Sequence, residues 1–145
     1  MLREIRGSSF AEASAGDLLA STGAARAFLR RQELKPGDRC ALLAHNSIRW
    51  VAMDLAILAE GLIAVPLYAR QAPAELAGMM KDCSPALLCC GDAALREAIA
   101  SAWPQAPRSA TFDEIFAGSA GADDSPVQPL QGSSPVAIIY TSGTS

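Results

Sequence analysis

Three short apolar runs alternate with longer stretches of helical periodicity, and this alternation constrains the fold more than any other feature of the sequence. The runs are residues 39–45 (RCALLAH), 62–67 (LIAVPL) and 86–90 (ALLCC). Apolar runs of four to eight residues bounded by turn residues are typical of buried strands. Strands separated by helices favour a parallel sheet covered by helices. The predicted fold class is therefore α/β, with at least three βα units from Arg39 to Trp103.

Four stretches with apolar residues at three- and four-residue steps predict helices around these strands. They run from Gly16 or Asp17 to about Arg31, from Ser47 to Gly61, from Pro73 to Pro85, and from Gly91–Asp92 to Trp103. Ser47, with Asn46 before it, is a good N-cap residue, and Pro73 suits a first helical turn. The residues expected to be largely buried are Val51, Leu55, Leu58, Leu62, Leu76, Met80, Leu87 and Ile138.

The periodic pattern weakens from Ser109 onward. Residues 109–112 (SATF) are compatible with a short strand, and residues 113–117 (DEIFA) with one helical turn. Residues 118–135 are rich in Gly, Ser, Pro and Ala, which predicts a mobile surface linker. The run Val136–Tyr140 (VAIIY) is apolar on both faces, so we expect it to pair inside the sheet as a central strand.

The balance of charge argues against two classes of partner. The chain has 12 Lys and Arg against 15 Asp and Glu, a formal net charge of −3, and no basic cluster. Nucleic acids and anionic membrane surfaces are bound through such clusters. The N-terminus lacks an apolar run of signal-peptide length, and the longest uncharged stretch, 125–145, contains three prolines. We therefore expect no membrane span and a cytoplasmic location.

The four cysteines, Cys40, Cys83, Cys89 and Cys90, do not have the spacing of a zinc site. No CxxC pair is present, and neighbouring residues of a strand point to opposite faces of the sheet. Buried free thiols in a reducing compartment are the interpretation we favour. The acidic pair Asp123–Asp124 has no further carboxylate at ligand spacing, so no metal site is predicted.

The most informative segment for function consists of the last five residues, Thr141, Ser142, Gly143, Thr144 and Ser145. They place four hydroxyl groups and a glycine directly after a predicted strand. A ligand crevice is expected at the carboxyl end of a parallel strand, and successive N–H groups around a glycine form an anion-binding nest. An ordinary Ser/Thr/Gly turn has the same composition, however. The segment is not a Walker A loop, because it has no Gly-Lys-Ser/Thr sequence.

The string AIIYTSGTS (residues 137–145) resembles the start of the phosphate-binding signature of the adenylate-forming superfamily. That superfamily contains acyl- and aryl-CoA synthetases, luciferases and the adenylation domains of peptide synthetases. Residues 34–91, from LKPGDR to LLCCG, are similar to its first βαβ region, with the Gly-Asp-Arg turn, the Asn-Ser cap and the Val-Pro-Leu run in order. The resemblance covers about Leu18 to Ser145, and the long-chain fatty-acid synthetase branch is the most similar.

The resemblance implies an ATP-dependent acid–thiol ligase, an acyl-CoA synthetase. A carboxylic acid, here a fatty acid, is activated as an acyl-adenylate, and coenzyme A then displaces AMP. ATP and Mg²⁺ are implied, with Thr141, Ser142, Gly143, Thr144 and Ser145 along the β- and γ-phosphates. An adenylation domain or acyl-AMP ligase that loads a carrier protein is the alternative within the superfamily. A non-catalytic α/β interaction module is the alternative outside it.

The sequence departs from the family in one important respect. It stops inside the signature, before the Gly-x-Pro-Lys-Gly continuation, and it lacks the later motifs that hold ribose and supply the catalytic lysine. We therefore interpret residues 1–145 as the N-terminal portion of an AMP-binding domain, without catalytic residues of its own and inactive alone.

Five further residues have more than one interpretation. His45, the only histidine, fits a structural or solvent role better than general-base catalysis. Trp50 fits packing better than ligand stacking, and Met79 and Met80 fit core filling. Arg70 lies just after the predicted strand 62–67, where it either reaches a phosphate or carboxylate or is a solvated loop arginine.

Overall fold

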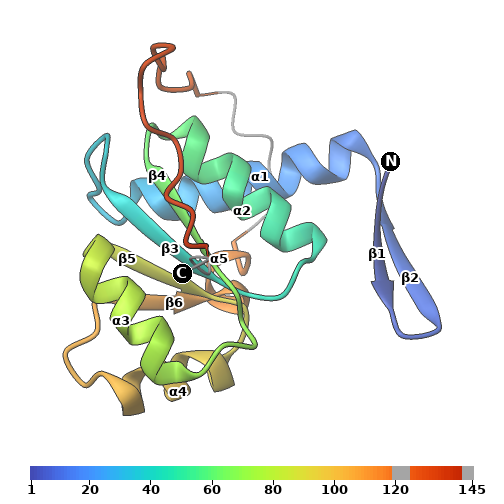
Figure 1. Ribbon diagram of the computed structural model, residues 1–145. Helices are drawn as coiled ribbons and strands as arrows, with labels where there is room; N and C mark the ends of the chain where they lie inside the picture. The colour runs from blue at the N-terminus through green and yellow to red at the C-terminus, as the bar shows by residue number, and fades with distance from the viewer. Residues whose placement is uncertain (119–124, 142–145) are drawn as a thin grey trace.

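The computed structural model describes residues 1–118 and 125–141. Its helices and strands alternate along the chain after an N-terminal hairpin (Figure 1). The elements are β1 (Leu2–Arg6), β2 (Ser9–Ala13), α1 (Ala15–Arg30), β3 (Arg39–Leu43), α2 (Ile48–Ala59), β4 (Ile63–Leu67), α3 (Pro73–Cys83), β5 (Leu87–Cys90), α4 (Ala93–Ala102), β6 (Ser109–Thr111) and α5 (Phe112–Ile115).

Four of the strands form one parallel sheet in the order β4-β3-β5-β6. The helices α1 and α2 cover one face of this sheet, and α3 and α4 cover the other (Figure 1). The units β3–α2, β4–α3 and β5–α4 confirm the α/β prediction between Arg39 and Trp103. The short strand and the helical turn predicted for 109–117 are present as β6 and α5.

The strand β3 lies at the centre of the core and is buried on both faces. Residues 40–43 have no exposed surface. Alternate residues pack toward the two helical layers, Cys40 toward α1 and α2 and Ala41 toward α3 and α4. The same alternation separates Cys89 from Cys90, as predicted. All four cysteines are buried and free.

Side-chain caps explain where three of the helices begin. Ser14 and Asp17 form a capping box at the start of α1. The Ser47 hydroxyl accepts a hydrogen bond from the Trp50 amide in α2, which confirms the predicted cap, and Asp92 caps α4 in the same way. Each cap satisfies an amide that has no partner inside its helix and stabilises the helix by about 1 kcal/mol.

The buried face of α2 differs from the predicted one. Leu62, which follows α2, and the residues Leu76, Met80 and Leu87 are buried as expected, but Leu55 is 40% exposed. Val51, Leu58 and Ile138 are only half-buried. The residues of α2 that face the core are Ala52, Met53, Ala56 and Ile57. Because α2 is apolar nearly all round, periodicity alone did not select this face. Its small alanines allow close packing against the small residues of α1, such as Ala24 and Ala25.

The N-terminal hairpin was not predicted. The strands β1 and β2 pair antiparallel and lie apart from the main sheet, at the right of Figure 1. Opposite each other across the hairpin are Arg3 and Glu12, and also Ile5 and Phe10. Ile5 is 84% exposed, so the hairpin has no apolar face of the kind that marks a strand in sequence. Two features of the sequence could have indicated the hairpin. One is the opposite charge of Arg3 and Glu12, and the other is Gly7, which adopts a φ of +60° in the turn.

The prediction for Val136–Tyr140 was right about pairing but wrong about position. This segment runs parallel to β4 through one bridge between Ala64 and Ala137. The Ala64 amide donates to the Val136 carbonyl and the Ile138 amide donates to the Ala64 carbonyl, each over 2.9 Å. Ile139 is 64% exposed, because the described part of the chain has no strand on the far side of the segment. The segment is therefore the edge of the described sheet and not a central strand.

The predicted linker, residues 118–135, falls partly outside the described residues, as does the pair Asp123–Asp124. Its described part, 125–135, lies at the surface and contains neither helix nor strand. This part is nevertheless attached to the fold, because the Gln128 amide donates to the Ala59 carbonyl over 2.8 Å. Its mobility stays a prediction.

Within the two described stretches, every helix is too short or too polar to cross a lipid bilayer.

The packing of the core predicts that two leucines differ in how much they contribute to the free energy of unfolding. Leu76→Ala should lower the free energy of unfolding by about 2–5 kcal/mol, because it leaves a cavity beneath α3. Leu55→Ala, which removes the same atoms from a partly exposed site, should cost less than about 1 kcal/mol. Urea denaturation followed by circular dichroism measures both, and equal losses would contradict the observed burial.

The burial of the thiols predicts their reactivity. Burial raises the pKa of Cys40 to about 12 and that of Cys90 to about 12, so neither forms a thiolate near neutral pH. With iodoacetamide at pH 8, these two cysteines and Cys89 should stay unmodified in the native protein and react in urea. Mass spectrometry of the digested protein reads each site, and rapid native alkylation of Cys40 or Cys90 would contradict the packing.

Candidate functional site

A cleft lies at the carboxyl end of the parallel sheet, where β3 and β4 end beside residues 136–140. Its volume is about 660 Å³. Its polar lining comes from His45, Asn46, Tyr68, Arg70, Gln71 and Tyr140, and its apolar lining includes Ile5, Trp50 and Met79.

The directions of two helices explain why the cleft forms here. The chain leaves β3 toward α2 on one face of the sheet and leaves β4 toward α3 on the other face. Adjacent parallel strands whose following helices diverge in this way leave a crevice outside their carboxyl ends. This is the place where ligands bind in open α/β sheets, so the topology itself marks the cleft as the candidate site.

Tyr140 anchors the segment that approaches the cleft. Its hydroxyl oxygen lies 2.6 Å from Asp82 Oδ2 and 2.9 Å from the carbonyl oxygen of Met79, and its one hydrogen is shared between these two acceptors. Burial, together with the hydrogen bond to Asp82, raises the pKa of Tyr140 above its usual value. The phenol therefore stays protonated at neutral pH and ties residues 136–140 to α3 rather than acting as a base.

Of the five predicted phosphate-binding residues, Thr141 is the one that the structure describes. It is exposed and directly follows Tyr140, which lines the cleft. Ser142, Gly143, Thr144 and Ser145 lie outside the described residues. Their role in phosphate binding stays a prediction.

Arg70 and His45 both line the cleft and are both exposed. Arg70 follows β4 by three residues, and no ion pair of its guanidinium is observed within residues 1–118 and 125–141. Its position suits either of the two roles expected for it. His45 faces solvent, in keeping with the role favoured from the sequence.

The hairpin contributes a wall of the cleft that the sequence did not reveal. Glu4 Oε2 accepts a hydrogen bond of 3.0 Å from the Ile48 amide at the start of α2. This contact and the Ser47 cap bring acceptors to two free amides of the same helix, where negative charge is favourable. The hydrogen bond from Arg6 and the bond from Ile48 lower the pKa of Glu4. Ile5, next to Glu4, thereby reaches the cleft.

Trp50 packs against the core, as favoured from the sequence, and ligand stacking by its ring stays untested. It is half-buried and packs against the core cluster beneath α1 and α2, and it also lines the cleft. Met80 fills the core as predicted, whereas Met79 is half-buried and contributes to the cleft.

The described residues do not offer a ready metal centre. Among residues 1–118 and 125–141, no three His, Cys, Asp or Glu side chains gather closely enough to hold an ion. The binding chemistry of the cleft rests on hydroxyl, amide, imidazole and guanidinium groups, which suit an anionic ligand.

Comparison with known proteins gives matches over most of the chain. The sequence model of the family described as "AMP-binding enzyme" matches residues 10–145. A carboxylic acid reductase from Mycobacterium marinum (strain ATCC BAA-535 / M) is 32% identical over 84 residues, which make up 57% of this chain and 7% of the reductase. The chain spans 3% and 7% of the length of two curated relatives it matches.

Two solved structures share the fold of the chain over most of its length. ATP-bound MatB from Rhodopseudomonas palustris has a TM-score of 0.77 and 26% identity, and the match covers 88% of this chain and 27% of MatB. A fatty acyl CoA synthetase from Mycobacterium tuberculosis has a TM-score of 0.72 and 25% identity, with coverage of 88% and 26%.

The Glu4 contact predicts a pH-dependent attachment of the hairpin. Because the folded pKa of Glu4 is lowered from 4.5, its contribution is present above pH 4.5 and disappears as the pH falls through the folded value. Glu4→Gln should cost roughly 0.3–1 kcal/mol at pH 7, the usual worth of a charge at a helix N-terminus. The difference between variant and wild type should vanish near pH 2.

Urea denaturation at the two pH values measures this difference. Glu12→Gln is the matched control, because it removes a carboxylate from the same hairpin that pairs with Arg3 and not with α2. A pH-independent cost for Glu4→Gln would show that the charge at the helix end contributes nothing.

Proposed function

This chain belongs to the AMP-binding enzyme family, whose members form adenylates, and from that membership we propose that it is the N-terminal part of an ATP-dependent acid–thiol ligase. The observation that carries the proposal is the course of residues 136–141. They run parallel to β4, Tyr140 lines the cleft at the carboxyl end of the sheet, and Thr141 follows at once. This course brings Thr141, the first of the five hydroxyl-rich residues in the sequence, next to the crevice in which an α/β sheet binds ligands.

The proposed reaction has two steps. A carboxylate oxygen of the acid attacks the α-phosphorus of ATP, the bond between the α-phosphorus and its bridging oxygen breaks, and pyrophosphate leaves with the electron pair. The product is an acyl-adenylate, in which the unreactive carboxylate has become an electrophile. A thiolate then attacks the acyl carbon, the bond to the AMP oxygen breaks, and AMP leaves as the thioester forms.

In this proposal Thr141 and the four residues after it, Ser142, Gly143, Thr144 and Ser145, bind the β- and γ-phosphates. Their hydroxyl and amide groups donate hydrogen bonds to oxygens that become more negative as pyrophosphate departs. Donors already in place for that charge stabilise the transition state more than the ground state. Each hydrogen bond to a charged group contributes about 1.5–3 kcal/mol.

The family also implies Mg²⁺, which when bound would neutralise phosphate charge. The described residues do not supply a carboxylate cluster of the kind that holds this ion. No step above is therefore assigned to a metal held by residues 1–118 or 125–141.

For the substrates, we propose a fatty acid as the acid and coenzyme A as the thiol. The similarity to a fatty acyl CoA synthetase supports both, and the similarity to an ATP-bound enzyme supports ATP as the energy source. A reducing, cytoplasmic compartment belongs to the same proposal, because four free buried cysteines suit such surroundings.

Pyrophosphate exchange into ATP tests the first step, and it needs no thiol. In the full-length protein, Thr141→Ala and Thr144→Ala should each lower the exchange rate about 10- to 100-fold, which corresponds to one lost hydrogen bond of about 1.5–3 kcal/mol. Ser134→Ala is the control. Its hydroxyl accepts from the Gln131 amide in a surface turn outside the cleft, so exchange should stay unchanged. Undiminished exchange in both threonine variants would remove this segment from the mechanism.

The identity of the thiol that accepts the acyl group tests the second step. Full-length protein with a fatty acid and ATP should consume coenzyme A and release AMP. If adenylate forms but reacts only with a carrier protein, the protein is a carrier-loading enzyme and not an acyl-CoA synthetase. Residues 1–145 alone should give no turnover, and turnover by this piece would refute its assignment as a catalytically incomplete part.

A further inference from the structure

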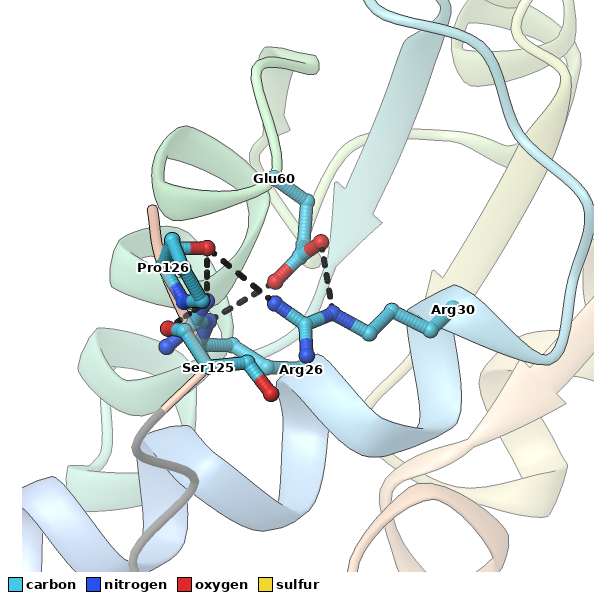
Figure 2. Close-up of polar contacts among 5 residues, drawn as sticks. All are labelled: Arg26, Arg30, Glu60, Ser125 and Pro126. Atoms are coloured by element: carbon cyan, nitrogen blue, oxygen red, sulfur yellow. Dashed lines mark hydrogen bonds and ion pairs between the residues drawn. The ribbon is translucent and has the colours of Figure 1, made fainter. Parts of the chain in front are cut away.

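A buried charged cluster lies far along the chain from the predicted phosphate-binding loop. Arg26, in the C-terminal half of α1, is 6% exposed and is the only charged residue that is buried among those the structure describes. Its Nε lies 2.7 Å from Glu60 Oε1, and Glu60 is the C-cap residue of α2. Arg30, one turn after Arg26, lies 3.0 Å from the other oxygen of the same carboxylate. Figure 2 shows both arginines of α1 directed at Glu60.

The cluster also holds the backbone of the segment that leads to residues 136–141. Arg26 Nη2 donates to the carbonyl oxygens of Ser125 and Pro126 over 3.0 and 3.1 Å. Arg30 Nη2 donates to the Pro126 carbonyl over 3.3 Å (Figure 2). Two residues further on, the Gln128 amide donates to the Ala59 carbonyl at the end of α2. Residues 125–128 are thus fastened to the junction of α1 and α2.

A buried ion pair is not an efficient way to stabilise a fold. The desolvation of both charges offsets most of their attraction, and apolar side chains of the same size are often as stable or more so. What the planar guanidinium of Arg26 adds is direction, because it contacts a carboxylate and two carbonyls at fixed angles. The cluster is therefore better explained by the position it imposes on residues 125–128 than by the stability it adds.

That position matters because, among the described contacts, residues 136–140 are held in register mainly by one bridge to β4 and by the hydrogen bonding of Tyr140 to α3. Ala137 lies level with Ala64, so three residues further on Tyr140 lies level with Leu67, the last residue of β4. A slip of one residue moves the segment by about 3.3 Å and turns its side chains to the opposite face. One bridge to an edge specifies register weakly, and the fastened segment limits how far the chain can shift.

We propose that Arg26, acting through Glu60 and the carbonyls of Ser125 and Pro126, is a positioning residue for the phosphate-binding segment that begins at Thr141. This inference rests on the proposed function for its effect on ATP. The cluster holds residues 125–128, the held segment keeps 136–140 in register beside β4, and that register sets where Thr141 meets the cleft.

The test uses full-length protein carrying Arg26→Met, which keeps the length of the side chain and removes the guanidinium. Amide hydrogen exchange should accelerate at Ile138 and Ala64, whose bonds hold the edge segment, and stay unchanged at residues 40–43 of β3. In pyrophosphate exchange, the KM for ATP should rise about 10- to 100-fold, since a displacement of about 1 Å can cost about 100-fold. The KM for the acid should stay within about twofold, a split that a general loss of stability does not produce.

Two further variants complete the test. Arg49→Met is the matched control, because it removes a guanidinium from an exposed pair with Asp113 and should change neither readout. Arg26→Lys keeps the charge but loses the planar fork, so it should shift both readouts in the same direction to a smaller extent. If Arg26→Met does not fold, Arg26→Lys tests the positioning role in its place.

The outcomes separate the two proposals. Unchanged exchange at Ile138, or equal changes in both KM values, would overturn the positioning role of Arg26. Absence of pyrophosphate exchange in the wild type would refute the proposed function instead. The hydrogen-exchange comparison would then still decide whether Arg26 holds residues 136–140 in place.

Discussion

The burial of β3 on both faces is the constraint on which the rest of the structure depends. Its residues 40–43 have no exposed surface, so each face of the strand needs its own helical layer. Small side chains such as Cys40 and Ala41 make this possible, because they let α1 and α2 on one side and α3 on the other approach the sheet closely. The two layers follow from the central strand, and the cleft follows from the two layers.

The cleft lies at one end of the stretch 125–140, and the cluster around Arg26 lies at the other. At one end, Tyr140 ties the segment to α3 and lines the cleft. At the other, Arg26 and Glu60 fasten the chain that leads into it. A segment held by a single bridge to β4 thereby has a defined course between two side-chain anchors. Polar contacts, rather than a continuous ladder, determine where Thr141 emerges.

Local signals were sufficient for most of the fold and for part of the site. The apolar runs and helical periods predicted β3, β4 and β5 and the helices between them, and Ser47 was recognised as a cap. The hairpin escaped because its pairing relies on exposed partners such as Arg3 and Glu12. The inward face of α2 was not predicted correctly, because this helix has apolar residues on more than one face. In the site, the approach of Ile5 and the anchoring of Tyr140 depend on contacts between residues more than thirty positions apart.

The sequence by itself determined the order of strands and helices, the α/β class, the free buried thiols and the resemblance to adenylate-forming enzymes. The structural features follow from periodicity, capping and composition, which act over a few residues, whereas the resemblance rests on short motifs in a characteristic order. Only the tertiary structure decided that Val136–Tyr140 lies at an edge, that Leu55 faces outward, and that Arg26 is buried beside Glu60. Such outcomes depend on which distant surfaces meet. Burial is a property of both partners of a contact, and a local pattern specifies only one of them.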